Sequence, residues 1–478
     1  MNMNRKFILA AALLMLGLQM NAQQTVFPLK GKVVDQNGKG IDGVVVNDGV
    51  HFVQTDARGQ WALTSDTTVS KFVSYSTPAA YELNQDNGLA RFYIPVAEAV
   101  QPKAKNIFTL TARTASADRF TYVAISDPQV RNDKEMKRWR TETVADLALV
   151  LPSLHTPVVT MTLGDLVFDA MGLYPEYAAS LQGMGTTVFQ TIGNHDFDKR
   201  YQDLHNMRLG APAYGEQRYG WFFGPTDYSF NIGKVHVVTM KNINYVGGKK
   251  YIEALTDQQL AWLEKDLSYV EKGSTVFLNM HAAAWNKVAN DGNVRNAKQL
   301  AKVLEGYNVH VFCGHTHYYQ NIIVSPTLYQ HNIAAACGAW WAGKVSVCGA
   351  PNGYLIVDVD GNDVRWHYKP TGMPVTKQMR LYAPGTFKTQ KDYLVASIWD
   401  WDDSCHVAAY ADGKALPTPE RFTDIDEAYV EQQQAAGKKP QQVQTPHLFR
   451  MKVPEGTREV RVVFTNRFGE AYSETLAL

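Results

Sequence analysis

The sequence predicts a central α/β domain between two small all-β sandwich domains. Residues from about 113 to 372 contain continuous apolar or β-branched runs, typical of strands buried on both faces, and helical segments separate most of them. Residues 23–112 and 373–478 instead contain short β-rich segments between turns. The length of 478 residues agrees with this division, because roughly 150 residues per domain gives about three domains.

The first 22 residues have the pattern of a secretory signal peptide. Arg5 and Lys6 precede an apolar run over residues 7–18, and a polar stretch ending at Ala22 follows. The run is shorter than the roughly 20 apolar residues that a membrane-spanning helix needs. We therefore expect cleavage after Ala22, no transmembrane segment in the mature chain, and a periplasmic or extracellular location.

Residues 23–112 are expected to form a small antiparallel β-sandwich. The turn pairs Asn37-Gly38, Asp48-Gly49 and Arg58-Gly59 separate its β-rich segments. Those segments are residues 32–34, 44–46, 52–55 and 61–63. The stretch resembles carboxypeptidase-regulatory or transthyretin-like sandwiches, and it has no cluster of catalytic residue types. We expect a structural or carbohydrate-contacting role.

The central domain, residues 113–372, alternates strands with helices, which indicates a layered α/β architecture. The expected strands are residues 120–126, 158–163, 187–192, 235–240, 275–280 and 308–313. The expected helices are residues 141–151, 256–267 and 295–305. The second helix begins with Thr256 and has Gln259 three residues later, which is a capping-box pattern.

Residues 373–478 return to short strands and predict a second β-sandwich. The expected strands are residues 393–398, 406–410, 448–453 and 459–464. A polar insert at about 423–445 contains a Glu-, Gln- and Ala-rich stretch that suits a helix. The acidic segment 399–403 is expected to be a solvated turn at a strand end, with a Ca²⁺ or glycan site as the alternative.

Charge and cysteine content narrow the class of protein. With 47 Lys and Arg against 46 Asp and Glu, the net charge is +1, and no basic excess points to nucleic acid as a partner. The cysteines all lie beyond residue 300, so they do not form a disulfide framework. Cys337 and Cys348 can pair across a loop or stay buried thiols, and the sequence leaves both open. It also leaves the oligomeric state open.

Five polar motifs follow five of the expected strands. They are Asp127-Pro128-Gln129, Gly164-Asp165, Gly193-Asn194-His195-Asp196, His281 and Gly314-His315-Thr316-His317. Ligands of open α/β sheets lie outside the carboxyl ends of the strands, so these side chains can converge on one point. Imidazole nitrogen and hard oxygen together suit Mn, Fe or Zn. Asp165 can bridge two such ions at about 3.5–4 Å separation.

The ordered set D-x-Q, GD, GNHD, H and GHTH, over residues of about 118–372, resembles the calcineurin-like metallophosphoesterases. The flanking zones are similar to the accessory β domains of secreted bacterial members. This resemblance implies a four-layer α/β/β/α sandwich around two divalent metal ions. The implied ligands of the first metal are Asp127, Gln129, Asp165 and His317, and those of the second are Asp165, Asn194, His281 and His315. His195 would protonate the leaving oxygen, and Asp196 would orient His195.

Gln129 departs from the family pattern, because most members have His there. A neutral amide oxygen binds a metal more weakly than imidazole does and favours a harder ion such as Mn²⁺. The alternative is that Gln129 only lines the pocket. Trp340 and Trp341 can form a stacking wall for substrate or pack in the core. Arg200 can contact a phosphate or remain a solvated charge.

The resulting hypothesis is a secreted dinuclear-metal phosphoesterase in which a metal-bridging hydroxide attacks phosphorus in line. Its substrate would be a small phosphorylated molecule: a phosphomonoester, a phosphodiester or a nucleoside-diphosphate derivative. Two alternatives remain open at this point. One is a phosphoprotein phosphatase, and the other is a non-catalytic glycan-binding surface protein with a degenerate central domain.

Overall fold

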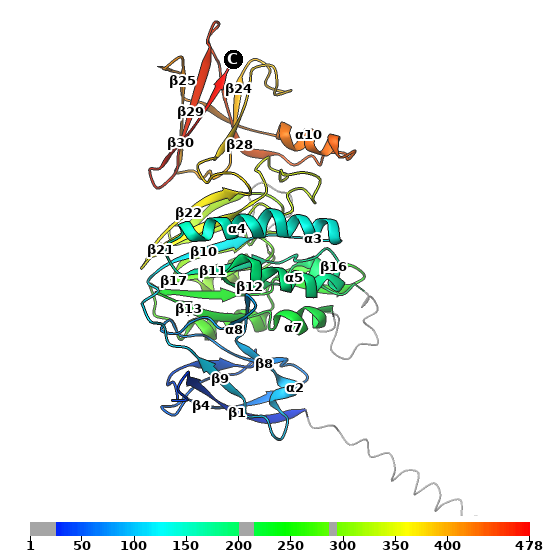
Figure 1. Cartoon of the computed structure of the whole chain (residues 1–478), viewed down its shortest axis with the longest axis vertical. Helices are drawn as coiled ribbons and strands as arrows, with labels where there is room; N and C mark the ends of the chain where they lie inside the picture. Colours follow the sequence, from blue (N-terminus) through cyan, green and yellow to red (C-terminus); the bar gives the residue numbers. More distant parts are fainter. Residues whose placement is uncertain (1–24, 200–214, 286–293) are drawn as a thin grey trace, which may run out of the picture.

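The computed structural model describes residues 25–199, 215–285 and 294–478. The molecule is elongated, with a β-sandwich at each end and a layered α/β body between them (Figure 1). The predicted signal peptide, residues 1–22, and Arg200 lie outside the described residues. Within the described ranges, no helix has both the length and the apolar character to cross a membrane.

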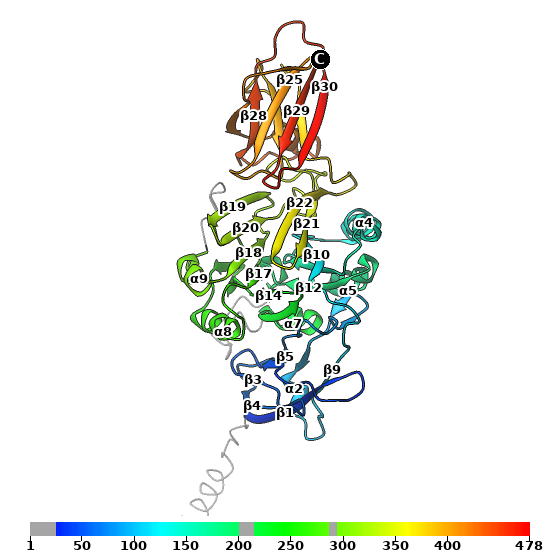
Figure 2. The same ribbon diagram turned by 90° about the vertical axis from the view of Figure 1, so that its left-hand side faces the viewer.

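Two β-sheets face each other in the central body, and helices cover their outer faces (Figure 2). The first sheet has the order β22 (Asp363–Pro370), β21 (Gly353–Asp360), β10 (Arg119–Ile125), β11 (Val158–Leu163), β12 (Thr187–Thr191), β7 (Leu89–Ala90) and β6 (Gln85–Asp86). The second has the order β13 (Tyr228–Ile232), β14 (Val235–Thr239), β17 (Thr275–Asn279), β18 (Asn308–Cys313), β20 (Leu328–Asn332) and β19 (Gln320–Ser325).

Aromatic side chains fill the space between the two sheets. Phe120 and Tyr122 from β10 pack against Phe277 from β17 and Phe312 from β18. The Tyr122 hydroxyl donates to Asn279 across the interface. The helices α4 (Ala145–Val150) and α5 (Tyr174–Leu181) lie on one side, and α8 (Asp257–Leu267) and α9 (Ala297–Val303) lie on the other (Figure 2). The helices α3 (Asp133–Trp139) and α7 (Gln217–Phe223) pack in the same hydrophobic cluster as α4 and α5. The predicted four-layer α/β/β/α architecture is confirmed.

Most helices and strands of the central domain lie close to the residue ranges predicted from the sequence. Thr256 caps α8, and its side chain and that of Gln259 form the predicted reciprocal capping box. The helix expected at residues 141–151 is the second part of a longer helical run. That run begins at α3, where the Asn132 side chain accepts from the Glu135 amide, and passes through a π-helical turn at Arg140–Val144. The sequence prediction missed the Asn132 cap.

The N-terminal domain contains two sheets. One is β4 (Gln60–Asp66), β1 (Val26–Asp35) and β9 (Ile107–Leu110), and the other is β3 (Phe52–Gln54), β2 (Val45–Asn47), β5 (Phe72–Tyr75) and β8 (Tyr93–Pro95), followed by α2 (Val96–Ala99). Strands β1 and β9 pair in parallel, so the sandwich is not purely antiparallel. The β6–β7 hairpin leaves this domain and pairs with β12 of the central sheet, where Leu89 lies opposite Val188.

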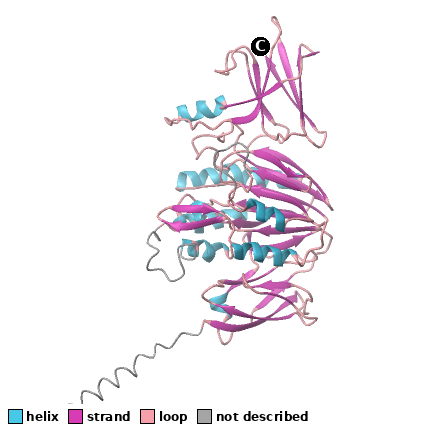
Figure 3. Ribbon diagram, turned by 180° about the vertical axis from the view of Figure 1, so that it is seen from behind, coloured by secondary structure: helices cyan, strands magenta, loops and turns pink. Residues whose placement is uncertain are grey.

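The C-terminal domain also contains two sheets. One is β23 (Met379–Tyr382), β24 (Leu394–Ile398), β28 (Thr445–Met451) and β27 (Glu420–Asp424), and the other is β26 (Lys414–Ala415), β25 (His406–Ala411), β29 (Glu459–Thr465) and β30 (Ala471–Ala477). The helix expected in its insert is α10 (Glu427–Ala435). Figure 3 shows that both end domains are built mainly from strands, with most helices in the centre. All four cysteines are free and buried, so Cys337 and Cys348 are unpaired.

Candidate metal centre

The loops that carry the predicted site residues have an uncommon backbone conformation. Asp127, Gln129, Asp165, His315 and His317 all have φ between +42° and +68°. Non-glycine residues in this left-handed region cost of order 1–3 kcal/mol each, and such strain gathers at functional sites. The surrounding strands hold these five residues in place despite that cost.

Two glycines of the motifs allow the carboxylates to approach neighbouring loops. A Cβ atom on Gly193 would collide with the Asp165 carboxylate, and one on Gly314 would collide with Asp127. The GNHD and GHTH motifs therefore begin with glycine because the side chains of the first sheet pass directly over the backbone there.

Three buried side chains form a first group of possible metal ligands. Asp127 Oδ1, Gln129 Oε1 and His317 Nε2 have no hydrogen-bond partner in the described part of the chain. His317 Nε2 lies 3.6 Å from Asp127 Oδ1. The Gln129 amide nitrogen donates to Asp165 Oδ2 at 2.6 Å, which leaves its oxygen without a partner. Burying a polar atom without a partner costs roughly 1–3 kcal/mol, so this arrangement favours a bound cation.

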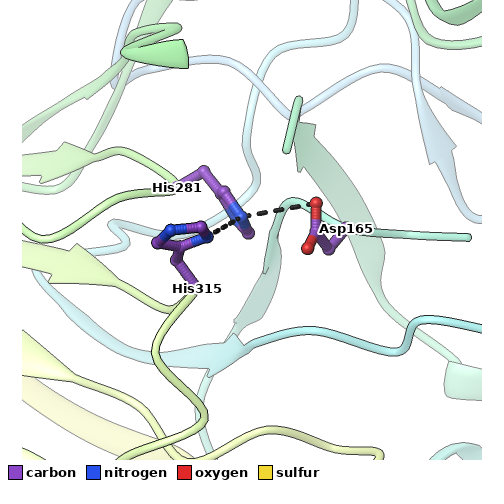
Figure 4. Close-up of side chains that lie close together, drawn as sticks. All are labelled: Asp165, His281 and His315. Atoms are coloured by element: carbon purple, nitrogen blue, oxygen red, sulfur yellow. Dashed lines mark hydrogen bonds and ion pairs between the residues drawn. The ribbon is translucent and has the colours of Figure 1, made fainter. Parts of the chain in front are cut away.

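A second group of possible ligands lies around Oδ1 of Asp165. One ligand atom each from Asp165, His281 and His315 lies within 4.8 Å of the other two, and the three side chains point toward one another (Figure 4). His281 Nε2 lies 3.1 Å from Asn194 Oδ1, 3.1 Å from His315 Nδ1 and 3.3 Å from Asp165 Oδ1. Burial opposes charge on His281, but the Asp165 carboxylate raises the pKa of His281 to about 10. This position thus stabilises a positive charge.

The remaining ring nitrogens of the three histidines have acceptors that fix their orientation. His281 Nδ1 lies 2.7 Å from Leu163 O, and His317 Nδ1 lies 2.7 Å from Gly338 O. His315 Nε2 lies 3.1 Å from Glu253 Oε1. When these nitrogens donate, the opposite nitrogen of each ring keeps the lone pair that a metal needs. Glu253 was not predicted as a site residue, because nothing in the sequence marks a lone Glu at the end of β16 (Lys250–Glu253).

His195 lies at the edge of the same site, but its orienting partner is not the expected one. Its Nδ1 lies 3.0 Å from Asp169 Oδ1, and its ring stacks on Phe168 with 3.7 Å between centroids. Asp196 instead accepts from the Gly193 and Leu166 amides. The prediction that Asp196 orients His195 is wrong. The two residues share one tight 3₁₀ turn, which sends successive side chains in different directions.

The two adjacent tryptophans have different environments. The Trp340 ring stacks on the His317 ring with 4.7 Å between centroids, and it lines the cavity above the ligand groups. Trp341 is buried, and its indole nitrogen donates to Pro128 O at 3.0 Å. Of the two alternatives, Trp340 is therefore placed to form a stacking wall, whereas Trp341 packs in the core.

Family models match nearly the whole described chain. The model described as the N terminal of calcineurin-like phosphoesterase matches residues 28–113, the calcineurin-like phosphoesterase model matches residues 120–319, and the C-terminal model matches residues 330–472. The chain belongs to the calcineurin-like phosphoesterases. It is a metal-dependent hydrolase of phosphate esters.

Parts of this chain are similar to solved structures of phosphatases at low sequence identity. A dimetal phosphatase from Danio rerio is 15% identical, with 53% of this chain and 96% of that chain covered and a TM-score of 0.38. A purple acid phosphatase from yellow lupin seeds is 10% identical, with 72% and 67% covered and a TM-score of 0.40. A 5'-nucleotidase precursor from Thermus thermophilus is 13% identical, with 53% and 54% covered and a TM-score of 0.31. The comparison with curated proteins gave no match.

The residues present fit the divalent metals of a calcineurin-like phosphoesterase. The first group offers carboxylate, amide and imidazole atoms that are buried and without partners. The second offers two imidazoles, the Asn194 amide oxygen and Oδ1 of Asp165. Both sets combine nitrogen with hard oxygen, as Mn, Fe and Zn sites do.

Proposed function

We propose that this chain is an exported two-metal phosphoesterase that hydrolyses an ester of a small phosphorylated molecule. One observation carries the proposal. Gln129, which with Asp127 and His317 has a buried atom without a partner, contacts Oδ2 of Asp165, while His281 lies against Oδ1 of the same carboxylate. A single carboxylate between two donor groups is the arrangement by which one residue can serve two ions.

The first metal would be held by Asp127, Gln129, Asp165 and His317, and the second by Asp165, Asn194, His281 and His315. When bound, two divalent cations neutralise charge on the phosphoryl oxygens and lower the pKa of water. The Gln129 oxygen is neutral, so Mn²⁺ is the favoured occupant of the first position, with Fe and Zn as the other candidates.

His195 supplies the proton in this proposal. Asp169 accepts from its Nδ1 and stabilises the charged imidazolium, and Phe168 holds the plane of the ring. His195 also lines the cavity, so its Nε2 can deliver a proton to the departing alkoxide oxygen. Lys199 donates to Asn194 O and lies 3.6 Å from Asp169, which ties this pair to a proposed ligand of the second metal.

The test is a metal-reconstitution assay on the full mature chain. Metal-stripped protein is mixed with Mn²⁺, Zn²⁺ or Fe²⁺ and assayed on p-nitrophenyl phosphate, bis-p-nitrophenyl phosphate and a nucleoside diphosphate sugar. We expect two metal ions per chain and hydrolysis that returns with added metal, best with Mn²⁺. Failure of every metal to restore hydrolysis of every ester would overturn the proposal.

Export is supported by the pattern of Arg5, Lys6 and the apolar run over residues 7–18. Expression of the full chain beside a chain that begins at Gln23 would test it. We expect the full chain outside the cytoplasm with Gln23 as its mature N-terminus, and the shortened chain inside. Retention of both in the cytoplasm would contradict export.

A further inference from the structure

The cavity above the metal ligands has a wall that comes from the C-terminal domain. The cavity has a volume of about 650 Å³. It is lined by the proposed ligands Gln129, Asp165, Asn194, His315 and His317, and by His195, Thr316, Tyr251 and Trp340. The remaining lining residues are Gln441, Gln442, Val443 and Gln444, from the segment between α10 and β28. No other residues of the C-terminal domain line this cavity in the described part of the chain.

The backbone of segment 441–444 is held at both ends. The Gln441 amide donates to the Tyr429 hydroxyl at 3.0 Å, and the Tyr318 hydroxyl donates to Gln444 O at 3.2 Å. Between them, Val443 packs against the hydrophobic core. Because Tyr318 directly follows the proposed ligand His317, the segment is fixed relative to the metal centre.

Helix α10 adds a second connection to the site. The Gln432 side chain accepts from the Val345 amide at 2.7 Å and donates to Val345 O at 2.9 Å. Val345 belongs to the loop that also carries Trp340, and Gly338 in that loop accepts from His317. Hydrogen bonds therefore connect the C-terminal domain, which carries segment 441–444, to the loop that carries Trp340.

The side chains on this wall are chemically distinctive. Gln441, Gln442 and Gln444 are exposed, and no described residue hydrogen-bonds their side-chain amides. Each amide offers both a donor and an acceptor, which suits alcohol hydroxyls. The Trp340 ring supplies an apolar face nearby. None of the described lining residues is Lys or Arg, so the lining offers no side-chain cation for a second phosphate.

We propose that segment 441–444 is the specificity wall of this phosphoesterase and that it recognises the hydroxyl groups of a sugar phosphate. The sugar ring packs its C–H face on Trp340, while the glutamine amides bind its hydroxyls. This proposal rests on the proposed function, because the phosphate of the same substrate must be held at the metal centre.

The test compares two esters that differ in their hydroxyl groups. Glucose 6-phosphate and cyclohexylmethyl phosphate both carry a six-membered ring and a primary alcohol leaving group, but only the first has ring hydroxyls. We expect a higher kcat/KM for glucose 6-phosphate with the full mature chain loaded with Mn²⁺. In the triple variant Gln441→Ala, Gln442→Ala and Gln444→Ala, we expect the ratio of the two kcat/KM values to fall. The fall should be about 30- to 1000-fold, since each of the three neutral hydrogen bonds contributes roughly three- to tenfold.

Gln434→Ala is the matched control. Gln434 is also exposed and lies on α10, but it does not line the cavity, so its removal should leave the ratio unchanged. Thermal unfolding of each variant checks the fold. If the triple variant does not fold, the single variant Gln442→Ala should lower the ratio about three- to tenfold.

The outcomes separate this proposal from the proposed function. Equal kcat/KM for both esters, or a ratio unchanged in the glutamine variants, would overturn the specificity wall while leaving the phosphoesterase intact. A clear preference for adenosine monophosphate that the glutamine variants do not alter would overturn it as well. Absence of hydrolysis of all these esters and of p-nitrophenyl phosphate would overturn both.

Discussion

The N-terminal β-sandwich adds strands to the central sheet, whereas the C-terminal β-sandwich reaches into the active-site cavity. From the first domain, β7 pairs with β12, and Phe92 packs on Phe189 and Tyr228. None of its residues lines the cavity in the described chain. From the second domain, residues 441–444 line that cavity directly. The two β-sandwiches therefore differ in their position relative to the metal centre. Only the C-terminal one presents a segment, residues 441–444, to the cavity beside the ligands of the central domain.

The two interfaces also differ in chemistry. The N-terminal contact combines the aromatic cluster of Phe92, Phe189 and Tyr228 with neutral hydrogen bonds such as that between Ser229 and Ser76. The C-terminal contact contains buried carboxylates instead. Asp400 accepts from the Tyr319 hydroxyl at 2.7 Å and the Asn321 amide at 2.9 Å, and Asp402 accepts from the Tyr329 hydroxyl at 2.5 Å. The solvated turn expected at residues 399–403 was wrong, since both carboxylates are buried and hydrogen-bonded to the central domain.

If neither β-sandwich contributes a metal ligand, the rate of hydrolysis should depend on the ligand-bearing loops of the central domain. The variant Asp165→Asn is the strongest test of this expectation. The variant loses the negative charge shared by both donor groups. We expect kcat/KM on p-nitrophenyl phosphate to fall by about 10³-fold or more, because metal ions contribute several kcal/mol to such reactions. Metal content measured in parallel should drop below two ions per chain. Full activity with two metals retained would refute the site assignment.

His195→Ala should give the next largest effect, and only on esters with poor leaving groups. General acid catalysis contributes about 10²–10⁴-fold, so kcat/KM on an alkyl phosphate should fall by that factor. The loss on p-nitrophenyl phosphate should be small, because nitrophenolate leaves without a proton. Asp169→Asn should follow the same pattern more weakly, and Asp196 variants should be unstable instead. Equal losses on both esters would rule out the proton-donor role.

The interface between the N-terminal domain and the central sheet should affect the free energy of unfolding and should not affect substrate preference. Leu89→Ala removes a buried side chain from β7, and we expect the free energy of unfolding to fall by about 2–5 kcal/mol. The ratio of kcat/KM for glucose 6-phosphate and cyclohexylmethyl phosphate should stay constant, in contrast to the glutamine variants. A changed ratio would show that the two sandwiches are not functionally distinct.

The C-terminal contact should weaken as pH rises. Burial raises the pKa of Asp400 to about 6, above its unfolded value of about 3.9, so the folded state binds the proton more tightly. This stabilisation is present below pH of about 4 and is lost as pH rises through about 6, a change of about 3 kcal/mol at most. The measurement is the stability difference between the wild type and Asp400→Asn at pH 4.5 and 7.5. We expect the wild-type advantage to be larger at pH 4.5, and a difference independent of pH would contradict this.

Gln129 variants should give the smallest change and sharpen the assignment of the first metal. Gln129→Ala should weaken binding of one metal about 10- to 100-fold, the range for partners of a metal site. Gln129→His should shift preference from Mn²⁺ toward Zn²⁺, because imidazole is the softer ligand. Calorimetric titration of both variants with both ions provides the measurement. Titrations identical to that of the wild type would show that Gln129 only lines the pocket.

The proposed metal ligands could be predicted from the sequence because their positions relative to neighbouring strands are visible in the chain. Each ligand directly follows a strand whose apolar run is visible in the chain, and the GNHD and GHTH glycines mark close approaches of the backbone. By contrast, the sequence does not show whether Asp169 or Asp196 contacts His195. The direction of the 3₁₀ turn at Asn194–Asp196 decides this. No composition or spacing reports that direction.

The layered α/β fold, the strand ends and the residue types that can hold two metals are all predictable from the sequence, because they follow from periodicity and short motifs. The distant segments that surround the site become visible only in the folded chain. Glu253 contacts His315 from 62 positions away, and Gln444 contacts Tyr318 from 126 positions away. Such contacts form because long-range packing brings the segments together, and a hydrophobic pattern specifies that a segment is buried without specifying its neighbours.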